Sequence, residues 1–105
     1  MANKYGAIKT ITSDGIKHDS IKEANRWCEL NLLLRAGMIQ DLKRQVKFEL
    51  LPKQDGERPV YYIADFVYTE NGKKVVEDTK GCRTEVYKLK KKMMLYFHGI
   101  KIKET

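Results

Sequence analysis

The chain has 105 residues, with 21 lysines and arginines against 14 aspartates and glutamates and a formal net charge of +7. This length excludes a second domain and leaves one small core. No segment approaches the ~20 consecutive apolar residues that cross a bilayer, and residues 1–9 lack the apolar centre of a secretory signal, so we expect a cytoplasmic protein. The excess of positive charge favours a polyanionic partner.

The N-terminal segment is polar and differs from the rest of the chain. Residues 1–19 contain scattered isoleucines and the turn signal Asp14-Gly15, which predicts an N-terminal arm or short ribbon. Residues 20–105 contain no linker or low-complexity segment that would divide them, and we expect them to form the folded domain.

The first helix is predicted from its end signals. Ser20 and Glu23 have the spacing of a capping box, and the run from Ile21 to Ala36 is free of Gly and Pro before Gly37 provides a stop. This pattern predicts a helix of about four turns over Ile21 to Ala36.

Three segments rich in β-branched and aromatic residues predict strands. The pair Asn71-Gly72 between the second and third segments is a strong hairpin signal, so these two strands are expected to be antiparallel. The three segments are Val46 to Leu51, Val60 to Thr69 and Lys73 to Lys80.

A second helix and a short strand complete the predicted order. Apolar residues at helical spacing predict a helix from Thr84 to Phe97, and Ile100 to Glu104 alternates apolar and charged residues as a final strand. The order α-β-β-β-α-β predicts an α+β domain with two helices packed on a mostly antiparallel sheet. The expected buried stripe of the second helix is Val86, Leu89, Met93 and Phe97.

One carboxylate lies on the apolar face of the first predicted helix. Glu23 shares a stripe with Trp27, Leu30 and Leu34 at steps of four, three and four residues. Its carboxyl either folds back onto the Ser20 backbone as half of a capping box or serves a function.

Two further aspartates lie among apolar residues on the predicted strands. Asp65 shares a face with Ile63 and Val67, and Asp78 shares a face with Lys80 on the neighbouring strand. Burying such charges costs several kcal/mol each unless they pair or bind a metal. The alternative is a surface ion pair between Asp78 and Lys80, worth less than ~1 kcal/mol.

These residues resemble the catalytic core of the PD-(D/E)XK nuclease superfamily over residues 20–104. YIADF contains Asp65, VVEDTKG contains Asp78 and Lys80, SIKEA contains Glu23, and the basic segment EVYKLKKK follows. The sequence is most similar to small phage-borne nuclease-like domains and, more distantly, to Holliday-junction resolvases. The resemblance implies a restriction-endonuclease-like αβββαβ core and a phage origin.

Two positions depart from the superfamily pattern. Ala64 stands where the superfamily's name has Pro, and Asp78 stands where Glu is more usual, with Glu77 beside it as a competing candidate. The strand period favours Asp78, because only an even separation places the carboxylate on the same side as Lys80.

The resemblance implies a Mg²⁺-dependent deoxyribonuclease, with Mn²⁺ as a possible substitute. Asp65, Asp78 and the Thr79 carbonyl would be ligands of the cation, which would polarise the phosphate and generate hydroxide. Lys80 would orient the attacking water or offset developing negative charge. Glu23 would hold the metal directly or through a water.

The second predicted helix carries a basic face. On the helical period Lys88 and Lys92 lie together with Lys91 on their flank, and we expect these three lysines to neutralise phosphates of nucleic acid. A solvated charged face without a partner is the alternative.

The expected activity is structure-selective cleavage of DNA, including branched DNA, in recombination or replication. A homodimer is expected, because a 105-residue monomer offers little surface for gripping branched DNA. Two alternatives remain: a catalytically inactive nucleic-acid-binding module, and a small phage protein that acts on a host factor. The sequence does not distinguish a DNA substrate from an RNA substrate, or endonuclease action from exonuclease action.

Overall fold

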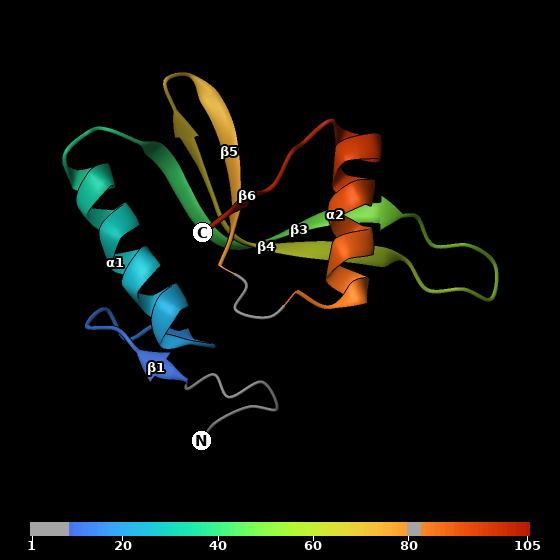
Figure 1. Cartoon of the computed structure of the whole chain (residues 1–105), viewed down its shortest axis with the longest axis horizontal. Helices are drawn as coiled ribbons and strands as arrows, with labels where there is room; N and C mark the ends of the chain where they lie inside the picture. The colour runs from blue at the N-terminus through green and yellow to red at the C-terminus, as the bar shows by residue number, and fades with distance from the viewer. Residues whose placement is uncertain (1–8, 80–82) are drawn as a thin grey trace.

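The computed structural model describes residues 9–79 and 83–105 (Figure 1). Lys80, the lysine of the expected site, lies outside these residues. The helices are α1 (Ile21–Arg35) and α2 (Glu85–His98), and the strands are β1 (Thr10–Ile11), β2 (Lys17–His18), β3 (Gln40–Leu51), β4 (Val60–Glu70), β5 (Lys73–Asp78) and β6 (Lys103–Glu104).

The main sheet has four strands in the order β3-β4-β5-β6. The β3–β4 and β4–β5 pairs are antiparallel, and the short C-terminal strand β6 runs parallel to β5. The predicted α+β class with a mostly antiparallel sheet and two helices is therefore confirmed. The strand expected over Val46 to Leu51 begins earlier, at Gln40.

The β4–β5 hairpin forms where its turn residues predict it. Asn71 and Gly72 both have positive φ, 53° and 75°, which is the backbone that a tight two-residue hairpin requires. Gly adopts this conformation without steric cost, and Asn is among the residues that tolerate it best. The local sequence is therefore sufficient to fix this turn.

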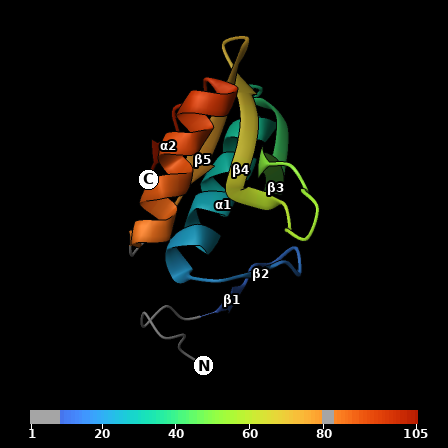
Figure 2. The same cartoon turned by 90° about the vertical axis from the view of Figure 1, so that its right-hand side faces the viewer.

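The β1–β2 pair forms a separate ribbon of two short antiparallel strands. Gly15, with φ 85°, lies in the turn between them. Figure 2 shows this ribbon beneath the N-terminal end of α1. The ribbon thereby carries His18, which is 1% exposed, to the start of the helix.

Helix α1 begins at the predicted cap and packs through aromatic and aliphatic residues. The Ser20 side chain accepts a hydrogen bond from the Glu23 backbone N–H at 3.0 Å. Trp27 and Leu30 pack in a cluster with Phe66 of β4. Leu34, expected on the same buried stripe, is instead 38% exposed, because the neighbouring Leu33 is the residue of the last turn that packs against this cluster.

Helix α2 packs on a different face from the one that its apolar spacing predicts. Its buried residues are Tyr87 and Met94, whereas Val86, Leu89 and Phe97 are each more than half exposed. The Tyr87 hydroxyl donates a hydrogen bond to Glu104 at 2.8 Å, and this polar contact with β6 helps to set the rotation of the helix. The expected stripe is therefore wrong at Val86, Leu89 and Phe97, whereas Met93 is partly buried against the cluster as expected.

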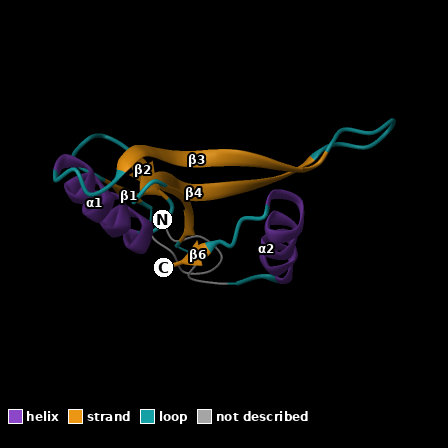
Figure 3. Cartoon of the chain, turned by 90° about the horizontal axis from the view of Figure 1, so that it is seen from above, coloured by secondary structure: helices purple, strands orange, loops and turns teal. Residues whose placement is uncertain are grey.

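The two helices lie on the same side of the β3–β4 ribbon and at opposite ends of it (Figure 3). Each covers its own buried cluster, one containing Trp27 and Phe66 and the other containing Tyr87 and Met94. Strand β4 contributes Ala64 and Val67 to the second cluster and Phe66 to the first, so Asp65 lies between residues of the two clusters.

Candidate active site

Glu23 is held at the start of α1 by contacts from the segment before the helix. Its carboxyl Oε2 accepts a hydrogen bond from the Asp19 backbone N–H at 3.1 Å and lies 3.3 Å from His18 Nδ1. The side chain therefore reaches Asp19 rather than Ser20, so only half of the expected capping box forms. Glu23 is 4% exposed, which makes its carboxyl part of the interior.

Asp65 lies in β4 and contacts the residue that follows β5. Its Oδ2 accepts two hydrogen bonds from Thr79, one from the backbone N–H at 2.8 Å and one from the hydroxyl at 3.0 Å. Thr79 therefore fixes the orientation of Asp65. The groups of Thr79 that contact Asp65 are its backbone N–H and its hydroxyl. Cation binding by the Thr79 carbonyl stays a prediction.

The carboxyl groups of Glu23 and Asp65 form a pair. Burial and, second, the hydrogen bond with the neighbouring carboxyl of Asp65 together raise the pKa of Glu23 to about 7. Two adjacent carboxylates cannot both ionise without strong repulsion, so the pair holds a proton near neutral pH. The structure thus brings together two of the predicted site residues from α1 and β4.

The backbone is irregular opposite Asp65. Extension of the β3–β4 register places Gln45 opposite Asp65, and Gln45 has φ 53°, in the left-handed region. For a residue with a side chain this conformation costs about 1–2 kcal/mol. Backbone strain of this kind is concentrated at functional sites in proteins.

Asp78 is fully buried and turns toward the α2 half of the molecule. The β4–β5 register pairs Phe66 with Glu77, and its next step brings Asp78 opposite Asp65. The Tyr62 hydroxyl donates a 2.6 Å hydrogen bond to Asp78 Oδ2, and this contact, together with burial, raises the pKa of Tyr62. Asp78 therefore lies opposite Asp65 in the sheet register, but its carboxylate accepts a hydrogen bond from Tyr62.

Glu77 has a structural role in the opposite half. Both of its carboxylate oxygens accept hydrogen bonds from Arg26, at 2.7 and 2.8 Å, and Tyr68 donates a third at 2.8 Å. These three contacts engage both oxygens of the carboxylate, which favours Asp78 over Glu77 as the functional residue of this strand. The sequence analysis missed Arg26, although a buried glutamate requires a cationic partner.

Lys88 and Lys92 of α2 are exposed and Lys91 is half-buried, and two of these three lysines contact carboxylates. Lys88 lies 3.4 Å from Glu85, and Lys91 lies 3.1 Å from Glu104, while Lys92 is exposed. Lys91 therefore supports the α2–β6 contact as well as the basic surface.

Within residues 9–79 and 83–105, no group of three or more acidic, histidine or cysteine side chains has an arrangement that could hold a metal ion. The described helices include none that is long and apolar enough to cross a membrane. The Glu23–Asp65 pair is therefore a two-carboxylate site in the described part of the chain.

Comparison with known proteins places the chain in a family. No curated protein and no solved structure matches it. A family described as "Protein of unknown function (DUF1064)" matches residues 2–104. Because this match spans nearly the whole sequence, the chain belongs to the DUF1064 family.

Proposed function

We propose that the protein is a metal-dependent deoxyribonuclease whose site is built on Glu23 and Asp65. The observation that carries the proposal is the carboxyl pair of buried Glu23 and half-buried Asp65, which holds a proton near neutral pH. A divalent cation in place of that proton would let both carboxylates ionise without repulsion. Mg²⁺ is commonly bound by only one or two carboxylates together with waters and substrate phosphates, so this donor set fits it.

The surrounding residues support the same role. Asp19 and His18 orient Glu23, and Thr79 orients Asp65. When bound, the cation supplies polarisation of the phosphate and an activated water. Lys80 directly follows Thr79 in the sequence, and we assign it the stabilisation of negative charge that develops on the phosphate.

The proposed substrate is DNA, because the chain carries a net charge of +7 and an exposed basic helix. Lys88 and Lys92 are the strongest candidates for phosphate contacts, with Lys91 beside them. We further propose that the substrate includes branched DNA and that the protein acts as a cytoplasmic homodimer. These proposals rest on the sequence arguments given above.

Cleavage assays test the proposal directly. Labelled duplex and four-way-junction DNA is incubated with the protein and Mg²⁺, Mn²⁺ or EDTA, and we expect products only with the cations. Asp65→Asn should reduce cleavage at least ~100-fold, because it removes a ligand of the cation. Asp55→Asn is the matched control, since Asp55 is an exposed loop residue. Equal loss in both variants, or cleavage that persists in EDTA, would contradict the proposal.

A nucleic-acid-binding module without catalysis is the second candidate. The observation that favours it is the Asp78 carboxylate, which is fully buried and accepts a hydrogen bond from Tyr62. DNA binding by the wild-type protein without any cleavage in Mg²⁺ or Mn²⁺ would support this candidate over the nuclease.

A further inference from the structure

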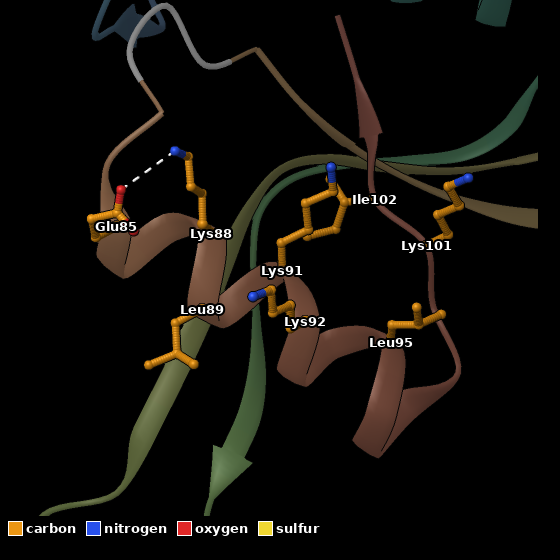
Figure 4. Close-up of a pocket in the computed structure, with 8 residues that line it drawn as sticks. All are labelled: Glu85, Lys88, Leu89, Lys91, Lys92, Leu95, Lys101 and Ile102. Atoms are coloured by element: carbon orange, nitrogen blue, oxygen red, sulfur yellow. Dashed lines mark hydrogen bonds and ion pairs between the residues drawn. The ribbon is translucent and has the colours of Figure 1, made fainter.

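A groove runs between α2 and the extended segment that leads into β6. Its volume is about 610 Å³. Leu89 and Leu95 of the helix and Ile102 of the segment give it apolar walls (Figure 4). The other lining residues are charged: Glu85, Lys88, Lys91, Lys92 and Lys101.

The helix that borders the groove exposes an unusual amount of apolar surface. Leu89 is 53% exposed and Leu95 is 55% exposed, and neighbouring Tyr96 is 83% exposed. Val86 and Phe97 are also more than half exposed. Contiguous apolar surface rimmed by polar residues is typical of protein–protein interaction sites.

The charge of the groove narrows the choice of partner. Four lysines line it against one glutamate, and neither Lys92 nor Lys101 forms an ion pair with any described residue. A second copy of this chain would bring two such lysine rims together, which is unfavourable. Phosphates of DNA would pair with the lysines but would gain nothing from exposed leucines.

We propose that the groove is a docking site for an acidic amphipathic segment of another protein. Apolar side chains of that segment would pack on Leu89 and Leu95, and its carboxylates would pair with Lys92 and Lys101. The segment would thus bury apolar surface that α2 leaves exposed. The proposal uses no residue of the Glu23–Asp65 pair, so it does not depend on catalysis. It shares Lys92 with the proposed DNA contacts, and the Leu95→Ser variant distinguishes the two because DNA would not use the leucine.

Selection from a displayed library of random peptides about 14 residues long, or roughly four helical turns, tests the proposal with the full chain. We expect enrichment of acidic peptides with apolar residues three and four positions apart. Leu95→Ser should weaken their binding at least ~10-fold, as should the charge reversal Lys92→Glu with Lys101→Glu. Leu32→Ser is the control, because Leu32 is 62% exposed but lies on α1.

Three outcomes would overturn the proposal. The first is failure to enrich acidic peptides, or enriched peptides that bind Leu95→Ser as tightly as the wild type. The second is a wild-type dimer in sedimentation that Leu95→Ser converts to a monomer, which would assign the groove to a second copy. The third is duplex DNA binding that weakens at least as much as peptide binding in Leu95→Ser. Circular dichroism on every variant excludes loss of the fold as the cause.

Discussion

The two halves of the β3–β4 ribbon differ in how they use charged residues. In the α1 half, carboxylates are buried and held by specific partners, as Glu77 is by Arg26 and Tyr68. In the α2 half, Asp78 is also buried with a partner, but the charged residues of the helix lie around exposed leucines at the surface. The comparison teaches that the first half is organised for a fixed internal site, whereas the second presents a surface with unsatisfied apolar area.

The largest expected effect is loss of the buried ion pair in the α1 half. Arg26→Ala leaves the fully buried Glu77 carboxylate without its cation, so the free energy of unfolding should fall by about 3–5 kcal/mol. Urea denaturation measures this loss. Arg35→Ala, an exposed position in the last turn of α1, is the control. A loss below about 1 kcal/mol in Arg26→Ala would show that the pair contributes no more than a surface contact.

Removal of a buried leucine from the same half should cost nearly as much. Leu30 has no exposed surface, so Leu30→Ala should lower the free energy of unfolding by about 2–5 kcal/mol through lost burial and a residual cavity. The result provides a reference for the exposed leucines of α2. A change smaller than ~1 kcal/mol would indicate that the α1 cluster collapses around the gap.

A smaller effect concerns the pH dependence of the carboxyl pair. Folding raises the pKa of Glu23 from 4.5 to about 7, so between these values the folded chain keeps a proton that the unfolded chain has lost. The free energy of unfolding should therefore fall as the pH rises through this window, by on the order of 3 kcal/mol. Glu23→Gln should flatten the profile, because a neutral amide has no proton to lose.

Two further measurements sharpen the pH prediction. Mg²⁺ should raise the melting temperature of the wild type above pH 7 but not that of Glu23→Gln, because ligand binding to the folded state stabilises it. Glu29→Gln is the control, since Glu29 is an exposed carboxylate of the same helix. An unchanged pH profile in Glu23→Gln would place the shared proton elsewhere.

The parts of the fold that sequence predicts well are those determined by neighbouring residues. The Asn71-Gly72 turn and the Ser20 cap each depend on contacts within a few positions, and both form as expected. The rotation of α2 depends on Tyr87 and Lys91 meeting Glu104 near the end of the chain. Apolar spacing within the helix carries no information about that distant carboxylate.

The candidate site follows the same rule. A carboxylate on an apolar stripe correctly marked Glu23 as unusual, and strand alternation marked Asp65. Their contact with each other joins the first helix to the middle of the sheet, and only the folded chain shows it. The pairing of Arg26 with Glu77 joins residues 51 positions apart and was not predictable from either segment alone.

The smallest expected effect completes the comparison in the α2 half. Leu89→Ala should change the free energy of unfolding by no more than ~0.5 kcal/mol, because the side chain is already 53% exposed in the folded state. Burial of Leu30 and exposure of Leu89 predict that the same substitution has very different costs at the two positions. Urea denaturation of both variants under one condition measures the difference. Equal destabilisation would mean that Leu89 is covered in solution, as it would be in a self-associated form, and sedimentation at several concentrations would identify that form.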